Sequence, residues 1–135
     1  MKNIVIHGFA KLIVKMSNRR LQNAELMDGS GRFTKPFHPE CKTVQLKVIA
    51  IALARIKRFF AQTDLSVAQH CVNMAKIFHF LGRDDLAKEA LFHEIGEVFM
   101  GDLASPLKRV FPVFKEIEEY LIKKVFGCLG LSYPM

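Results

Sequence analysis

The chain has 135 residues, half of them apolar, and a formal net charge of +7. This length is typical of one domain with a sizeable hydrophobic core. The basic residues are scattered and do not alternate with aromatic residues, so a nucleic-acid partner is not expected, whereas the positive field would favour a phosphorylated small molecule. The apolar run at residues 4–14 is interrupted by charged residues well short of a membrane span, so no membrane partner is expected.

The cysteine content favours a reducing compartment. Cys41, Cys71 and Cys128 form no metal-binding motif and cannot all pair with one another. Disulfide frameworks are typical of secreted proteins, so the sequence indicates the cytoplasm instead.

The N-terminal third mixes strand and helix signals. Within residues 1–27, the segment 4–6 resembles a strand and residues 9–16 repeat apolar side chains at helical spacing, so we predict a short strand followed by a helix. Residues 28–32 are predicted to form a turn, and residues 35–40, with two prolines, an extended loop.

The rest of the chain is predicted to be helical, which makes the fold class all-α. Ser66 is a suitable N-cap, Gly82 a suitable residue after a helix C-terminus, and Pro112 a favoured first helical residue. Arg55 and Arg58, three residues apart, would lie on one flank at the end of their helix. The predicted helices are Val44–Phe60, Ser66–Leu81, Asp84–Met100 and Pro112–Gly127.

The segment Leu91–Lys108 is the most informative part of the chain, because a histidine and several acids interrupt an apolar helix there. Polar groups on a core-facing helix cost free energy unless they are ligated or hydrogen-bonded. On an α-helix, His93 and Glu97 would share a face and Glu94 would lie on its flank. Imidazole and carboxylate together favour a divalent metal. His70, early in the preceding predicted helix, is the expected further ligand.

An ordered string of motifs extends this pattern over roughly residues 31–131, and it resembles the HD-domain metal-dependent phosphohydrolases. Within that family it is similar to the 5'-deoxynucleotidase-like branch, including short phage-type members. The motifs are Arg58-Phe59, Ser66-Val67-Ala68-Gln69-His70, His93-Glu94-Ile95-Gly96-Glu97, Gly101-Asp102-Leu103 and Pro106-Leu107-Lys108.

The resemblance implies a single HD domain over residues 1–135, folded as a helical bundle with a short N-terminal strand or hairpin. It also implies hydrolysis of a nucleotide, most simply a deoxynucleoside 5'-monophosphate. His70, His93 and Glu94 would hold a divalent transition metal, with cobalt, manganese, zinc, iron and magnesium all open. A homodimer also stays open.

The resemblance further assigns the substrate contacts and the acids. Arg58 matches an arginine that faces the substrate phosphate, and Lys108 is within expected reach of the same phosphate. Glu97 and Asp102 match acids beside the metal, where one of them would act on the attacking water. For Asp102 the competing interpretation is a turn residue that caps the next segment.

The chain departs from the family pattern at the metal. Glu94 stands where the family has Asp, so its carboxylate is one methylene longer. The family also supplies a metal-binding Asp from a later helix, and this sequence reaches Met135 without one. We therefore expect the domain to lack the C-terminal helix that carries this residue.

Two other functions stay open. The first is a degenerate HD domain that binds a nucleotide or a protein partner without turnover. The second is a zincin-like peptidase in which His93 and Glu97 are ligands and Glu94 is the base. That motif requires a second histidine where Glu97 stands, so it ranks last.

Overall fold

The computed structural model describes residues 24–36 and 39–132. It confirms an all-α fold with a small strand pair on the N-terminal side. The strand predicted at 4–6 and the helix predicted at 9–16 lie outside the described residues. No helix in the described part of the chain has the length and hydropathy needed to cross a membrane.

The strand pair is a short antiparallel hairpin made of β1 (Leu26–Met27) and β2 (Phe33–Thr34). The predicted turn at 28–32 is confirmed. Asp28 Oδ1 accepts backbone N–H groups from Ser30 at 2.8 Å and from Arg32 at 3.1 Å, which closes the turn in the manner typical of aspartate.

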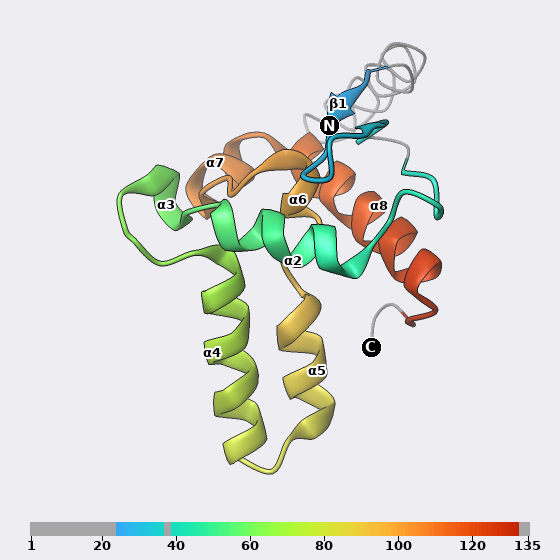
Figure 1. Ribbon diagram of the computed structural model, residues 1–135. Coiled ribbons are helices and arrows are strands. Elements are labelled where there is room, and N and C mark those ends of the chain that lie inside the picture. The colour runs from blue at the N-terminus through green and yellow to red at the C-terminus, as the bar shows by residue number, and fades with distance from the viewer. Residues whose placement is uncertain (1–23, 37–38, 133–135) are drawn as a thin grey trace, which may run out of the picture.

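The helices form a body around α2, from which α4 and α5 extend side by side as a helical hairpin (Figure 1). The core lies where α2, the start of α4, the end of α5 and α8 meet. Its buried members are Ile49, Leu53, Val67, Cys71, Ile95, Ile122, Val125 and Phe126. The helices are α2 (Leu46–Arg55), α3 (Arg58–Ala61), α4 (Val67–Phe80), α5 (Asp84–Phe92), α6 (Glu97–Met100), α7 (Ser105–Val110) and α8 (Pro112–Leu129).

Helix α4 has the boundaries that its caps predict. Ser66 accepts a hydrogen bond from Gln69 N at 3.1 Å as N-cap. At the other end, Gly82 has a φ of 70° and Arg83 N donates to Phe78 O at 2.9 Å. This is the Schellman arrangement, in which a left-handed glycine ends the helix.

The helix predicted over Val44–Phe60 is shorter than expected. Helix α2 ends at Arg55, because Ile56 is extended and accepts a hydrogen bond from Val67 N at 2.9 Å. Arg58 N then donates to Leu65 O at 2.9 Å, so contacts with residues further along the chain replace the helical hydrogen bonds. The prediction that Arg55 and Arg58 share a helix flank is therefore wrong.

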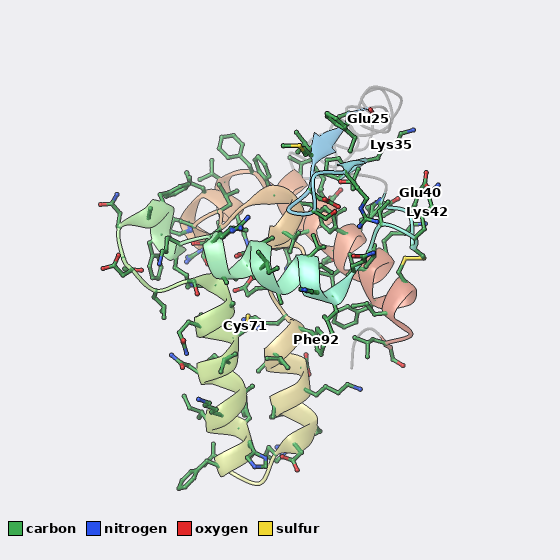
Figure 2. All side chains as sticks on the ribbon, in the orientation of Figure 1. Glu25, Lys35, Glu40, Lys42, Cys71 and Phe92 are labelled. Carbon is green, nitrogen blue, oxygen red and sulfur yellow. A yellow bond between two sulfur atoms is a disulfide. The ribbon has the colours of Figure 1, made fainter. Side chains whose placement is uncertain are left out.

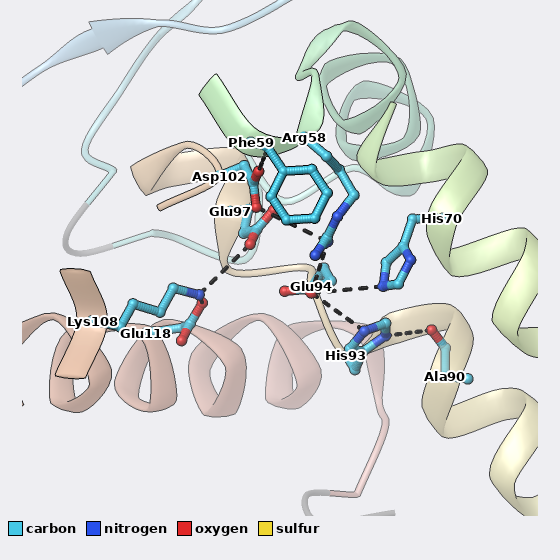
Figure 3. Close-up of polar contacts among 10 residues, drawn as sticks. All are labelled: Arg58, Phe59, His70, Ala90, His93, Glu94, Glu97, Asp102, Lys108 and Glu118. Atoms are coloured by element: carbon cyan, nitrogen blue, oxygen red, sulfur yellow. Dashed lines mark hydrogen bonds and ion pairs between the residues drawn. The ribbon is translucent and has the colours of Figure 1, made fainter. Parts of the chain in front are cut away.

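Helix α3 is a left-handed turn. Phe59, Phe60 and Ala61 have φ values of 55°, 54° and 61°, a region that residues other than glycine rarely occupy. The turn reverses the chain between α2 and α4. It brings the side chain of Arg58 back toward the end of α5 (Figure 3).

The helix predicted over Asp84–Met100 is also divided. Helix α5 ends at Phe92, and residues 93–96 form a tight turn before α6. Ile95 N donates to Phe92 O at 3.1 Å and Glu97 N to Glu94 O at 3.0 Å, the spacing of a 3₁₀ turn. His93 and Glu97 are therefore not on one face of an α-helix.

Gly96 allows helix α8 to lie close to this turn. A Cβ atom at Gly96 would lie 3.3 Å from Ile122 Cγ1 and 3.4 Å from Glu118 Cγ. Helix α8 therefore packs directly against the turn, and a larger residue would require these two side chains to shift by a few tenths of an ångström. This contact places Glu118 beside the predicted site.

The sequence does not predict helix α7. The helix after it, α8, begins where the sequence predicts and ends later than predicted. Helix α8 starts at Pro112, as predicted, but continues through Gly127 to Leu129. It ends at Gly130, which has a φ of 67°, with Leu131 N donating to Phe126 O at 2.8 Å.

Two of the three cysteines form a disulfide that the sequence did not predict. Cys41 and Cys128, 87 residues apart, join the loop before α2 to the end of α8 (Figure 2). Cys71 is free and buried. The expectation that the cysteines remain reduced therefore does not hold for this pair in the structure.

Candidate metal centre

Two segments bring the three predicted metal ligands together. His70 lies in the first turn of α4, and His93 and Glu94 open the tight turn after α5. One ligand atom from each lies within 4.8 Å of the others. Glu94 Oε1 is 3.3 Å from His93 Nε2 and 4.0 Å from His70 Nε2 (Figure 3). These side chains could hold a metal ion, as the sequence predicts.

The orientation of His93 fits a metal ligand. Its Nδ1 donates to the carbonyl oxygen of Ala90 at 2.6 Å, which leaves Nε2 facing Glu94. Histidines that bind metals commonly donate the second ring nitrogen to a carbonyl or carboxylate in this way. The rings of His70 and His93 have their centroids 5.3 Å apart, so both imidazoles border the same space.

Arg58 also contacts the carboxylate of Glu94. Its Nη1 is 3.2 Å from Glu94 Oε1 and 4.0 Å from Asp102 Oδ1. Asp102 Oδ2 also accepts the backbone N–H of Phe59 at 2.7 Å. Asp102 thus holds the left-handed turn that carries Arg58. The competing interpretation had it cap the next segment, but α7 has no side-chain cap hydrogen bond.

Glu97 is the most deeply buried acid of the site. It is 1% exposed, and its Oε2 atom has no hydrogen-bond partner among the described residues. Its Oε1 lies 3.6 Å from Lys108 Nζ, which also donates to Glu118 Oε1 at 2.6 Å. Lys108 therefore contacts these two acids, and its predicted role at a phosphate stays a prediction.

The pKa values of the site reflect this crowding. Hydrogen bonds with Cys71 and Glu94 raise the pKa of His93 to about 10, while burial lowers the pKa of His70. Burial by itself would raise the pKa of Glu94, but hydrogen bonds with His93 and Glu97 outweigh it and lower the value to about 2. Burial and then the charge of Glu94 raise the pKa of Glu97 to about 9. Without metal, Glu94 is therefore ionised and His93 and Glu97 carry protons at neutral pH.

All residues predicted for the site lie in this connected cluster. His79, which was not assigned to the site, lies at the far end of α4 beside Asp84. His38 and His7 are outside the described residues. The residues of the cluster are Arg58, His70, His93, Glu94, Glu97, Asp102 and Lys108.

Sequence reasoning missed two members of the neighbourhood. Glu118 lies among several acids of α8, and nothing local distinguishes it from Glu116 or Glu119. Cys71 is a core residue, as expected, but it also raises the pKa of the His93 imidazole. For Glu118 the signal would have been the small residue Gly96 opposite it, which only the packing of α8 reveals.

Comparison with known proteins leaves the family open. No protein-family model matches the chain. Uncharacterized protein YfdR of Escherichia coli (strain K12) is 37% identical over an alignment of 84 residues, and the match covers 58% of this chain and 45% of that protein. The chain thus spans less than half the length of that relative. No solved structure matches.

Proposed function

We propose that the protein is a metal-dependent phosphohydrolase of the HD-domain type that acts on nucleotides, with deoxynucleoside 5'-monophosphates as substrates. One observation carries the proposal. Two imidazoles and one guanidinium converge on a single carboxylate oxygen, Glu94 Oε1, at 4.0 Å, 3.3 Å and 3.2 Å. A group of side chains that could hold a metal ion thus lies beside a guanidinium, which is well suited to bind a phosphate.

His70, His93 and Glu94 would hold the metal, since two imidazole nitrogens and a carboxylate suit a transition metal. A bound divalent cation would supply positive charge that polarises a phosphate and lowers the pKa of a water molecule. The carboxylate of Glu94, longer by one methylene than the family's aspartate, already lies 3.3 Å from His93 Nε2. This spacing is close to the ~3.4 Å between two ligands of a tetrahedral ion with bonds of about 2.1 Å.

Arg58 would hold the phosphate. Its guanidinium is half-buried at the edge of the metal group and presents a planar set of donors that matches two phosphate oxygens. Asp102 would act through Arg58, because it accepts the Phe59 N–H and so fixes the turn.

Glu97 would manage the proton of the attacking water. Its carboxyl group is buried next to Glu94 and can exchange a proton with a group in hydrogen-bond reach. Burial and the charge of Glu94 raise the pKa of this carboxyl to about 9, and a cation bound to Glu94 would offset that charge, so that the carboxylate could accept the proton of the water.

The test is phosphate release from deoxynucleoside 5'-monophosphates with added Mn²⁺ or Co²⁺. Arg58→Ala should lower kcat/KM by about tenfold or more, because a charge-assisted phosphate contact contributes about 1.5–3 kcal/mol. Arg58→Lys should restore only part of the lost kcat/KM, since an ammonium group cannot reproduce the planar donors of a guanidinium. Metal content should stay unchanged in both variants. A parent protein that binds metal but releases no phosphate would refute the proposed activity.

A degenerate HD domain is the second candidate, and a specific contact favours it. Arg58 already pairs with Glu94, so the phosphate-binding group and a metal ligand neutralise each other in the structure. Such a domain would bind deoxynucleoside monophosphates in a calorimeter without hydrolysing them. The zincin-like alternative loses support, because it needs ligands one α-helical turn apart and residues 93–96 form a tighter turn.

The cytoplasm stays the predicted compartment, and the homodimer stays a prediction as well. Cys41 and Cys128 make the compartment testable, because both would be thiols in a reducing environment. Labelling of free thiols in protein purified from its native cells would distinguish the two states.

A further inference from the structure

A second group of possible ligands adjoins the histidines. Glu94, Glu97 and Glu118 come from the tight turn, from α6 and from α8, and their ligand oxygens lie within 4.8 Å of one another. Figure 3 shows Glu97 and Glu118 on the side of Glu94 away from His70. Glu94 belongs to both groups.

The burial of Glu97 provides an independent indication of a ligand. This side chain is 1% exposed, and its Oε2 atom is buried with no hydrogen-bond partner among the described residues. Buried carboxylate oxygens are normally satisfied by donors or by a metal ion. One carboxylate oxygen of Glu97 lies in the same group as oxygens of Glu94 and Glu118, so a cation there would bind this buried carboxylate.

The side chains in this region carry more negative than positive charge. Lys108 faces Glu97 and Glu118 at 3.6 Å and 2.6 Å, and Arg58 faces Glu94 and Asp102 at 3.2 Å and 4.0 Å. Four carboxylates thus meet two cationic side chains. When a cation displaces the proton of Glu97, all four carboxylates are ionised and two negative charges remain uncompensated by Lys108 and Arg58, which favours binding of divalent cations.

We propose that Glu94, Glu97 and Glu118 form a second divalent cation site, with Glu94 bridging it to the site of His70 and His93. Three carboxylates select a hard ion such as Mg²⁺ or Mn²⁺, whereas the imidazole site suits a transition metal. The proposal of this second site depends on metal binding by Glu94. It does not depend on phosphohydrolase activity.

Lys108 acts as an internal competitor for this site. Its ammonium occupies the space next to Glu118 in the metal-free protein, with a flexible four-carbon stem that can swing away. Binding of the second cation therefore displaces a lysine contact, and removal of this lysine strengthens the site.

The first experiment counts Mn²⁺ ions bound to the full chain after treatment with a chelator. The parent protein should bind two ions per chain, and Glu118→Gln only one. Glu116→Gln, an exposed neighbour on the same helix, should still bind two. His70→Ala should lose the imidazole site and keep the carboxylate site. Saturation of the parent at one ion, or two ions in Glu118→Gln, would overturn the proposal.

The second experiment looks for a gain, which misfolding cannot produce. Lys108→Met should raise the affinity of the weaker Mn²⁺ ion by about tenfold or more, because an ammonium no longer competes with it. Lys115→Met, an exposed lysine of α8, is the matched control and should leave both affinities unchanged. Unchanged affinity in Lys108→Met would contradict the proposal.

The electron paramagnetic resonance spectrum tests the bridge. Two Mn²⁺ ions that share Glu94 should couple and broaden the spectrum of the parent relative to Glu118→Gln. Two uncoupled ions would refute the bridging role. None of these measurements depends on turnover, so a protein that binds two ions without hydrolysing nucleotides would refute the proposed function and leave this site standing.

Discussion

Glu94 connects the groups of the site at the scale of single residues. His93, His70 and Arg58 all approach its Oε1 atom, and Glu97 and Glu118 lie on its other side. A shorter aspartate could not span the same set of partners without movement of the turn. The glutamate therefore suits the geometry of this chain, although the family pattern has aspartate at that position.

Loss of either imidazole should remove bound metal from the His70 site. His70→Ala and His93→Ala each delete a nitrogen ligand for which the described residues offer no replacement in the group. His79→Ala is the control, because His79 pairs with Asp84 far from the site. Elemental analysis of variants loaded with one equivalent of Co²⁺, which prefers the imidazole site, should show this difference. Equal metal content in all three variants would refute the assignment.

Metal affinity should rise with pH. A metal ligand must be a neutral imidazole, but hydrogen bonds with Cys71 and Glu94 raise the pKa of His93 to about 10. The ion must therefore displace a proton at neutral pH, and affinity should increase about tenfold per pH unit from about pH 6 to about pH 8. Calorimetry in two buffers with different ionisation enthalpies measures the released proton. A flat pH dependence would show that His93 is already neutral.

The raised pKa of His93 also affects the stability of the metal-free protein. This stability falls with rising pH, whereas metal affinity rises. Because the pKa of His93 in the folded state lies above its ordinary value of 6.5, the stabilisation from this group is complete below about pH 6.5. It is lost as the pH rises through the folded value of about 10. Rising pH thus strengthens metal binding and weakens the metal-free fold.

At the scale of elements, the left-handed turn of α3 stores strain next to the site. Each left-handed residue other than glycine costs about 1–2 kcal/mol. The turn persists because Asp102 binds Phe59 N, Leu65 O binds Arg58 N, and Lys57 Nζ donates to Asp64 O at 2.8 Å. Strain of this kind is common at functional sites, where it holds a side chain in place.

A glycine in this turn should stabilise the fold. Ala61 has a φ of 61°, so Ala61→Gly should raise the free energy of unfolding by about 0.5–1 kcal/mol, after the gain in unfolded-chain entropy is deducted. Ala50→Gly is the matched control in the exposed interior of α2, where the same change should lower the free energy of unfolding by about 1 kcal/mol. Urea unfolding measures both. Destabilisation in both variants would show that Ala61 is not left-handed in solution.

At the scale of the whole molecule, α8 ties the parts of the site to the core. Its buried face, Leu121, Ile122, Val125 and Phe126, packs in the core. The N-terminal half of the helix carries Glu118 to the site. The disulfide attaches the C-terminal half to the loop before α2. Helix α8 therefore links the stability of the fold to the geometry of the acids.

Reduction of the disulfide should destabilise the protein. The bond between Cys41 and Cys128 spans 87 residues, and closure of a loop of this length contributes about 4–5 kcal/mol in the chain-entropy estimate. Dithiothreitol should therefore lower Tm in the parent and in Cys71→Ser, but not in the double variant Cys41→Ser/Cys128→Ser. An unchanged Tm in the reduced parent would contradict this expectation.

Features that depend on neighbouring residues could be predicted from the sequence. Apolar spacing and caps predicted α4 closely, with Ser66 at its start and Gly82 at its end, because a cap acts on the turn next to it. The residue types of the metal group, His70, His93 and Glu94, were also predicted, since polar groups in apolar helices need partners wherever the helices pack.

The points at which the helices break, and the side chains that meet in the site, depend on packing between distant segments. The backbone of Ile56 bonds to Val67, and Gly96 lets α8 approach the turn after α5, so helical periodicity is overridden at both places. Glu118 joins the site and accepts a hydrogen bond from Lys108, although nothing near Glu118 in the chain marks it as a site residue. Such contacts join segments that lie far apart in the sequence, so their energies appear only when the segments are packed together.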